Sequence, residues 1–437
     1  MQTLAQLRSG ALKGAVSLKL SEGLSEFPKE IFELADTLEV LDLSHNKLKE
    51  LPADLGRLTK LRIFFCSYNL FTVLPEVLAD CPLLDIVGFK ANQIETVPLL
   101  SLNPNIRWLI LTDNNIAELP GEIGRCARMQ KLMLAGNRLS ELPEELSNCR
   151  NLALLRISAN RLTELPKWLL SMPKLSWLAF SGNLFSVSPD AVPLPFVGWN
   201  KLEILNVLGE GASGIIYKGV KGTEDVKREV AVKIFKGAVT SDGFPECEMN
   251  AFIAAGAHPG LVGLVGRVAG HPDGKHGLVM ELIPEHFHNL GLPPSFESCT
   301  RDVFADDVKL SVEQALKIAA TIASVAAQLH RKGIMHGDLY THNTLVDDEG
   351  NTLFGDFGAA AFYDRTDATT AFALERIEVS AFGHLLDDLL FLAGKTEESP
   401  SLMKLEKLRD AAITPDVMSR PGFQYLNDEL MKLQEHQ

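Results

Sequence analysis

The chain has 437 residues, of which 46% are hydrophobic and 7% aromatic, so it can bury a large core and is too long for one ordinary domain. Its net charge of −14 is unevenly distributed: residues 1–198 carry 20 basic and 21 acidic side chains, whereas residues 199–437 carry 22 and 35. An acidic second half without clusters of Lys and Arg argues against nucleic acid as a partner, because neutralising phosphates requires basic patches.

No segment of the sequence is typical of export or membrane insertion. The first stretch, MQTLAQLRSGALKGAVSLKL, lacks a sustained apolar core, and no later run approaches the length of a membrane span. Among the 6 cysteines, Cys81, Cys126 and Cys149 recur in register with the repeat described below, as expected for small buried side chains in a reducing compartment. We therefore expect a cytoplasmic protein with no membrane span and no disulfide scaffold.

A repeat organises the first half of the chain. An asparagine recurs every 23 residues, once after 22, within the pattern L-x-x-L-x-L-x-x-N-x-L-x-x-L-P, and a degenerate unit surrounds Gly23. This pattern is that of leucine-rich repeats, in which each turn supplies one short strand and a return arc, and the asparagine can satisfy backbone groups between coils. It predicts a solenoid of about eight repeats over residues 1–188. The recurring asparagines are Asn46, Asn69, Asn92, Asn114, Asn137, Asn160 and Asn183.

The L-P-x-x-L-x-x-L return segment resembles that of the plant intracellular Ras-group leucine-rich repeats and related bacterial proteins, and we predict a bacterial source. The resemblance implies a module that binds another macromolecule on a concave sheet, with a mere spacer as the alternative. Strand residues flanking the core leucines should face outward there, because side chains alternate along a strand. Most are apolar, which favours binding of a protein partner or a second copy; burial within the chain itself is the alternative. The two rows contain Val40, Ile63, Ile86, Trp108, Lys131, Leu154 and Trp177, and Phe65, Ile110, Met133 and Arg156, with Trp108, Trp177, Ile63, Phe65 and Ile110 as the expected partner contacts.

A linker is predicted over residues 189–199. The stretch SVSPDAVPLPFVGWN carries three prolines and interrupts the repeat after Ser188. Such a composition is typical of a short, semi-stiff connection between two domains.

The second half opens with a glycine-rich segment, LGEGASGIIYKGV, in which Gly209, Gly211 and Gly214 have G-x-G-x-x-G spacing. A dinucleotide-binding loop would begin a helix at the last glycine, but IIYKGV continues as a β-branched strand, so we expect a hairpin whose amides can cradle phosphates. The next strand, EVAVKIF, carries Lys233, which needs an anionic partner. Glu246 and Glu248 are the candidates, and Glu248 is preferred because Phe252 lies one helical turn away on the same face.

Over roughly residues 200–435 the sequence resembles the eukaryotic-type protein kinases. The motifs HGLVMELIP, HGDLYTHN, GDFG and SRPGFQYLNDEL follow in the family's order, which is more specific than any one of them. The resemblance implies a multidomain α/β chain: a leucine-rich-repeat solenoid followed by a bilobal protein-kinase-like domain over residues 200–437.

The resemblance also implies roles for single residues. Asp338 becomes the catalytic base, Asn343 and Asp356 become Mg²⁺ ligands, and Lys233 holds the ATP phosphates and is oriented by Glu248. The nucleotide site would further contain Gly209, Gly211, Gly214, Ile216, Ala231, Met280, Glu281, Ile283 and Leu345.

Several positions depart from the family pattern. Gly337 replaces the usual Arg that contacts a phosphorylated loop, so phosphorylation of the loop after DFG is not expected to be the main switch. Tyr340 stands where many serine/threonine kinases have a Lys, which predicts slow turnover. In the shortened segment ALERIEVSAFGHLL, Glu375 is expected to pair with Arg420, and Glu378 to take the place of a helix Asp of the family.

An active protein kinase is the favoured interpretation, because the positions of the base, the metal ligands and the Lys are all filled. A pseudokinase scaffold and a small-molecule phosphotransferase are the alternatives; the shortened segment after DFG favours the latter, whereas DFG itself and the R-P-x-F tail oppose it. His336 is expected to pack beneath the site. Surface positions are expected for His330, His342 and His384, and phosphorylation is conceivable at Tyr363, Thr366, Thr369 and Thr370.

Overall fold

The computed structural model describes residues 2–186, 193–211, 213–223, 226–237, 239–394 and 399–435. The chain divides into two compact units: the first contains Met1–Met172 and Asn183–Phe185, and the second contains Pro173–Gly182 and Ser186–Gln437. The predicted solenoid boundary at residue 188 therefore does not coincide with the boundary between the units. Residues 187–192, which include part of the predicted linker, lie outside the described residues.

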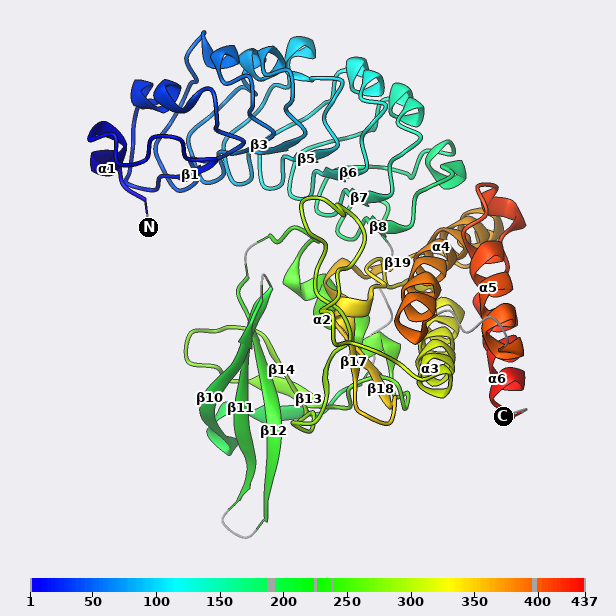
Figure 1. Ribbon diagram of the computed structural model, residues 1–437. Helices are drawn as coiled ribbons and strands as arrows, with labels where there is room; N and C mark the ends of the chain where they lie inside the picture. Colours follow the sequence, from blue (N-terminus) through cyan, green and yellow to red (C-terminus); the bar gives the residue numbers. More distant parts are fainter. Residues whose placement is uncertain are drawn as a thin grey trace. The chain divides into compact units, whose positions relative to one another are not determined.

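The first unit is a solenoid of short parallel strands (Figure 1). Its parallel sheet has the strand order β1 to β8, and successive strands pair in register, for example Val40 with Ile63. This is the predicted leucine-rich-repeat architecture. The elements are α1 (Leu4–Arg8), β1 (Ser17–Lys19), β2 (Val40–Asp42), β3 (Ile63–Phe65), β4 (Ile86–Gly88), β5 (Trp108–Ile110), β6 (Lys131–Met133) and β7 (Leu154–Arg156), followed by β8 (Trp177–Ala179) in the segment that belongs to the second unit.

The repeated asparagines join neighbouring coils. The side chain of Asn69 donates to the carbonyl of Leu43 in the preceding coil at 2.9 Å and accepts from the amide of Leu48 at 2.9 Å. Asn183 makes the same bonds to Ile157 and Leu162. Each buried side chain thus satisfies backbone groups that the short strands leave unpaired, which is the predicted role of the repeat asparagine.

The return arcs contain short 3₁₀ helices. Pro120 directly precedes η5 (Gly121–Arg125) and Pro143 precedes η6 (Glu144–Asn148). Proline is suited to this position because its fixed φ starts the turn and no amide hydrogen is lost from the helix. In these coils the proline of the L-P pair therefore marks where the 3₁₀ helix begins.

The cysteines of the described chain are free thiols, as predicted. We call Cys81, Cys126 and Cys149 the repeat cysteines; all three are buried in the solenoid core. Burial raises the pKa of Cys81 and Cys149 to about 12 and that of Cys126 to about 11. These thiols are therefore packing groups and poor nucleophiles.

The predicted partner face is less accessible than its sequence pattern suggested. Ile63 is only 8% exposed and Trp177 only 1%, so neither presents the open apolar surface that we expected. Ile86, Leu154 and Arg156, from the same two rows, are buried as well. Trp177 belongs to the second unit and packs there against Tyr340 and His384. For Trp177, the alternative interpretation is correct: the side chain is buried within the chain itself.

The second unit has a mixed sheet with the order β10-β11-β12-β14-β13-β9, followed by mostly helical structure (Figure 1). Its sheet strands are β9 (Phe196–Gly198), β10 (Leu202–Glu210), β11 (Gly214–Thr223), β12 (Val226–Phe235), β13 (Leu264–Ala269) and β14 (Gly277–Glu281). The helices are α2 (Pro245–Ala255), α3 (Val312–Arg331), α4 (Ala368–Ala393), α5 (Pro400–Ala412) and α6 (Phe423–Glu435). The second unit also contains five short strands outside the mixed sheet: β15 (His288–Asn289), β16 (Ile334–Met335), β17 (Thr344–Val346), β18 (Thr352–Phe354) and β19 (Ala361–Phe362).

The central helix α3 shows why these residues form this element. Ser311 caps it, with its hydroxyl accepting from the Gln314 amide at 3.1 Å and the Gln314 side chain accepting from the Ser311 amide at 2.7 Å. Its alanine-rich core face is buried, and small side chains allow neighbouring elements to approach closely. The loop that follows α3 is thereby fixed on a rigid support. No helix in the described parts of the chain is both long enough and apolar enough to cross a membrane.

Candidate active site

The first component of the site is an ion pair between the sheet and α2. Strand β12 places the ammonium of Lys233 in contact with the carboxylate of Glu248, whose side chain is 5% exposed. Burial raises the pKa of Glu248, and the charge of Asp356 acts in the same direction, whereas Lys233 lowers it. Glu246, the other candidate, lies 3.5 Å from His276 at the surface. The structure thus pairs Lys233 with Glu248, the preferred partner.

The glycine-rich segment is a hairpin, as its β-branched continuation predicted. Strands β10 and β11 pair antiparallel, with Glu210 opposite Ile215, and the Gly211 amide donates to the Gly214 carbonyl at 2.9 Å. Gly214 has no room for a side chain, because a Cβ would lie 2.6 Å from the carbonyl oxygen of Ile234. The loop therefore lacks the helix start that a dinucleotide-binding loop requires.

Four of the residues expected at the nucleotide site, Ile216, Ala231, Met280 and Glu281, come from neighbouring strands of the mixed sheet. Ala231 and Met280 are paired across β12 and β14 and share one apolar cluster, against which Ile216 packs. The amide of Glu281 donates to the Gly263 carbonyl at 2.8 Å, and its carboxylate pairs with Arg228 at 2.6 Å. Ile283 follows the end of β14, and Leu345 lies in β17.

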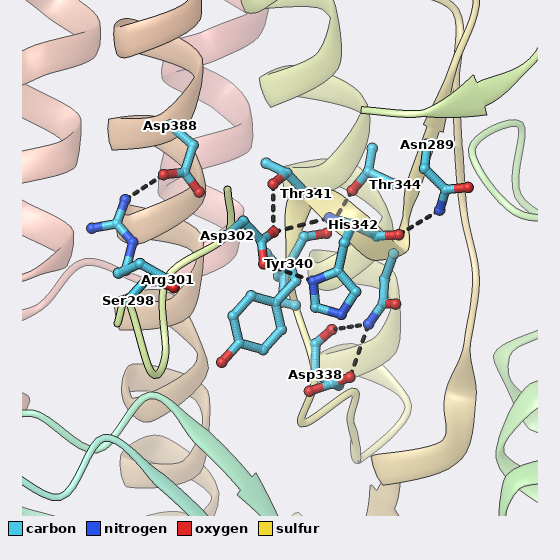
Figure 2. A network of polar contacts seen from close by, with 12 residues as sticks. Asn289, Ser298, Arg301, Asp302, Asp338, Tyr340, Thr341, His342, Thr344 and Asp388 are labelled. Carbon is cyan, nitrogen blue, oxygen red and sulfur yellow. Dashed lines mark hydrogen bonds and ion pairs between the residues drawn. The ribbon is translucent and has the colours of Figure 1, made fainter. Parts of the chain in front are cut away.

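Asp338 and Asn343 are joined directly. The side-chain amide of Asn343 donates to the Asp338 carboxylate at 2.8 Å and to the Asp338 backbone carbonyl at 3.0 Å. The 3₁₀ turn η9 (Thr341–Asn343) ends at Asn343 and returns its amide to Asp338. Figure 2 shows Asp338 in the polar network of this loop. This explains the spacing of five residues: one short turn of chain is needed for the amide to hold the carboxylate.

Glu378 of α4 holds the start of this loop. Its carboxylate accepts from the backbone amides of His336 at 3.1 Å and Gly337 at 2.6 Å, and from the His330 ring at 2.7 Å. Burial by itself raises the pKa of Glu378, but these hydrogen bonds and His330 outweigh burial and lower it. A fully buried carboxylate thus stays charged and fixes the two residues before Asp338.

Asp356 has a backbone conformation that is uncommon for residues other than glycine. Its φ of 54° is left-handed, and its carboxylate accepts from the Gly358 amide at 3.2 Å. The adjacent ring of Phe357 stacks on Phe252 of α2 at 4.9 Å and lies 5.1 Å from the ring of His336. This apolar column links α2, the GDFG motif and the loop of residues 336–343, which we call the catalytic loop because it carries the expected base, and it places the buried His336 beneath the site as expected.

Asp302, which no sequence signal indicated, anchors the other end of the catalytic loop (Figure 2). Its buried carboxylate accepts from the Thr341 hydroxyl at 2.5 Å, and from the His342 backbone at 2.9 Å and ring at 2.7 Å. The preceding residue, Arg301, contacts Asp388 of α4. Asp302 lies in the irregular stretch SCTRDVF between β15 and α3, where no motif or periodicity could have pointed to it.

Three histidines that we expected at the surface are not simple surface groups. His330 is buried between Glu378 and the Tyr363 hydroxyl, which lies 2.8 Å from its ring. His342 pairs with Asp302, which raises its pKa against the effect of burial. Burial next to Arg301 lowers the pKa of His384 to about 3, so this ring is neutral. Isolated histidines in a sequence give no sign of such partners.

The expected pair between Glu375 and Arg420 does not form. Arg420 donates instead to the backbone carbonyls of Thr414, Arg376 and Pro173, and burial lowers its pKa to about 10. Glu375 accepts from the Phe423 amide at 2.8 Å and pairs with the adjacent Arg376. The reason is that one continuous helix, α4, carries both Glu375 and Glu378, so the separate segment that would deliver a glutamate to Arg420 is missing.

The oxygen donors of the site suit Mg²⁺ only when a bound phosphate compound supplies further oxygens. Asp356 supplies a carboxylate and Asn343 an amide oxygen, which is the donor chemistry that Mg²⁺ prefers. Within the described residues, no group of three or more His, Cys, Asp and Glu side chains is arranged to hold a metal ion. A magnesium ion here would therefore be completed by phosphate oxygens and water, as is usual at nucleotide sites.

Comparisons with known proteins identify a kinase-like region and a leucine-rich-repeat region in this chain. Residues 202–380 match the family described as protein tyrosine and serine/threonine kinase, and residues 37–58 and 127–185 match leucine-rich-repeat families. A probable serine/threonine-protein kinase of Dictyostelium discoideum is 31% identical over 176 residues, which are 40% of this chain and 10% of that protein. Cyclin-dependent kinase 11.2 of Caenorhabditis elegans is 28% identical over 163 residues, 37% of this chain and 23% of that protein.

In the repeat region the chain is similar to the mouse leucine-rich repeat and calponin homology domain-containing protein 1, with 30% identity over 129 residues, 29% of this chain and 18% of that protein. The chain spans less than a third of the length of these relatives: 10%, 18% and 23%. The relatives named here are eukaryotic, so they give the predicted bacterial source no support.

Proposed function

We propose that this protein is an ATP-dependent protein kinase that transfers the γ-phosphate to a protein hydroxyl, with serine and threonine as the expected acceptors. The observation that carries the proposal is the simultaneous presence of the Lys233–Glu248 ion pair and the Asp338–Asn343 hydrogen bond, linked by the column of Phe252, Phe357 and His336. Phosphoryl transfer depends on positioning and charge compensation, and these contacts fix the groups that provide them.

The nucleotide would lie between the glycine hairpin and β17. Ile216, Ala231, Met280 and Leu345 would enclose adenine, and the backbone of Glu281 and Ile283 would offer hydrogen bonds. The hairpin glycines Gly209, Gly211 and Gly214 would let backbone amides approach the phosphates. Lys233 would hold the α- and β-phosphates, and Glu248 keeps its ammonium oriented.

Asp338 would orient the acceptor hydroxyl and take up its proton, because its carboxylate is held by Asn343 and its backbone by His336. Asn343 and Asp356 would hold Mg²⁺, which when bound supplies positive charge to the phosphate oxygens. Tyr340 cannot supply the cation that many kinases have at this position, so we expect slow transfer.

The repeat region is proposed to bind a protein, with Phe65, Trp108 and Ile110 as the remaining candidates on the concave rows. These side chains are half-buried. Trp108 is already engaged: the Lys131 ammonium lies 4.1 Å from its ring centre. A cytoplasmic location remains our expectation from the sequence.

The test is radiolabel transfer from Mg-ATP to the protein itself, to a generic protein acceptor and to small hydroxylated acceptors. Asp356→Ala should abolish Mg²⁺-dependent nucleotide binding, whereas Asp338→Asn should keep ATP binding and lose transfer. Glu248→Gln should lower transfer, because Lys233 loses its charged partner, and Glu246→Gln is the matched control on the same turn of α2. Full transfer by both Asp variants would refute the kinase function, and transfer to small acceptors alone would favour a small-molecule phosphotransferase.

A further inference from the structure

The ten-residue segment Pro173–Gly182, which we call the brace, belongs by its contacts to the second unit, although its sequence is that of the last repeat. It contains β8, and its central residue Trp177 is 1% exposed. Burying a tryptophan removes a large apolar surface from water, so its surroundings are a substantial contact. Those surroundings are the catalytic loop and α4.

Trp177 makes three contacts with these two elements. Its indole N–H donates to the backbone carbonyl of Leu339 at 2.9 Å. Its ring lies 4.4 Å from the ring of Tyr340 with planes only 3° apart, and 5.2 Å from the ring of His384 on α4. Leu339 and Tyr340 directly follow Asp338, so Trp177 fixes the chain on the C-terminal side of the candidate base.

The residue before Asp338 also meets the brace. A Cβ on Gly337 would lie 2.6 Å from the carbonyl oxygen of Leu178, and the φ of Gly337 is +76°. The brace backbone therefore occupies the space where a side chain at position 337 would begin. This gives a physical reason for glycine here, in the place where the kinase family usually has the Arg that meets a phosphorylated loop.

Two further hydrogen bonds tie the brace to the helical part of the second unit. The Ser176 hydroxyl bonds to that of Ser380 on α4 at 2.9 Å, and Arg420 donates to the Pro173 carbonyl at 2.7 Å. The bond between Ser176 and Ser380 is buried, and the bond between Arg420 and Pro173 is partly buried. The brace is thus attached at its first residue and directly beside Trp177.

We propose that the brace holds the catalytic loop in its working geometry, with Trp177 as a positioning residue for Asp338. This rests on the proposed kinase function. Glu378 fixes the loop from α4 at residues 336 and 337, and the brace fixes it at residues 337, 339 and 340. The carboxylate between these anchors is then held without a phosphorylated loop, and phosphoryl transfer depends on the brace.

The test compares Trp177→Ala and Trp177→Phe in the full chain. Trp168→Ala is the matched control, because Trp168 is a half-buried tryptophan in the preceding arc. The readouts are hydrogen exchange of the amides of residues 336–344, and kcat and KM for ATP. A displacement of about 1 Å can cost roughly 100-fold in rate, so Trp177→Ala should lower kcat at least about tenfold while KM for ATP stays within about threefold.

Trp177→Phe keeps an aromatic ring for Tyr340 but loses the N–H donor to Leu339, so it should fall between wild type and Trp177→Ala in both readouts. If Trp177→Ala does not fold, Trp177→Phe decides: faster loop exchange with a several-fold lower kcat supports the brace, and wild-type values in both overturn it. Exchange and kcat of Trp177→Ala equal to those of the control would also overturn it. If wild type transfers no phosphate, the proposed kinase function fails, and loop exchange alone decides whether the brace holds the loop.

Discussion

Replacing Gly337 by alanine tests the close packing of the catalytic loop against the brace. The φ of Gly337 is +76°, and a left-handed conformation costs a non-glycine residue about 1–2 kcal/mol. A Cβ would also lie 2.6 Å from the Leu178 carbonyl oxygen and 2.8 Å from that of Ala359, both closer than real contacts allow. These are backbone atoms that cannot rotate away, so overpacking should add about 1–3 kcal/mol. We expect Gly337→Ala to destabilise the second unit by about 2–5 kcal/mol in total.

Gly274→Ala separates the two contributions. Gly274, in the turn before β14, has a φ of +67°, but a Cβ added there would have no atom within 4 Å, so its substitution carries the conformational cost alone. Both variants are compared with wild type by urea unfolding followed through tryptophan fluorescence, with the unfolding free energy taken from the midpoint and slope. If Gly337→Ala is no more destabilising than Gly274→Ala, the contact with the Leu178 and Ala359 carbonyls does not exist as described.

Three other predictions follow from the same contacts. Changing Thr366, Thr369 and Thr370 together to alanine should leave most activity intact, because two of these hydroxyls bond to neighbouring aspartates, which would repel a phosphate; loss of activity that acidic replacements restore would contradict this. His384 is half-buried and its pKa is about 3, so the unfolded chain binds more protons below about pH 6.5, and wild-type stability should fall as pH drops through this range. Unfolding curves of His384→Gln should depend less steeply on pH between about 6.5 and 4, and an equal or steeper dependence would refute the assignment. The repeat cysteines, such as Cys81, should react with iodoacetamide only after unfolding, and mass spectrometry of the folded protein showing rapid labelling would argue against their burial.

The amino-acid sequence determined the architecture because its signals are local or periodic. The asparagine ladder repeats every coil, so one coil's hydrogen bonds predict the next, as Asn69 and Asn183 illustrate. The glycine hairpin could be distinguished from a helix start by the β-branched residues that follow it. The partner of Lys233 could be predicted because helical spacing places Glu248 and Phe252 on one face, and the structure pairs Lys233 with Glu248.

Only the tertiary structure decided what supports the catalytic loop. Trp177 meets Leu339 across 162 residues of chain, and Pro173 meets Arg420 across 247, so no local pattern can indicate either contact. In the sequence, Trp177 has the same repeat position as Trp108, and alternation along a strand predicts an outward side chain for both. Which residues cover Trp177 depends on the fold of a distant segment, and the repeat pattern contains no information about that segment. Asp302 is another such case, since a buried carboxylate is recognised only by the donors that surround it, and here these come from Thr341 and His342.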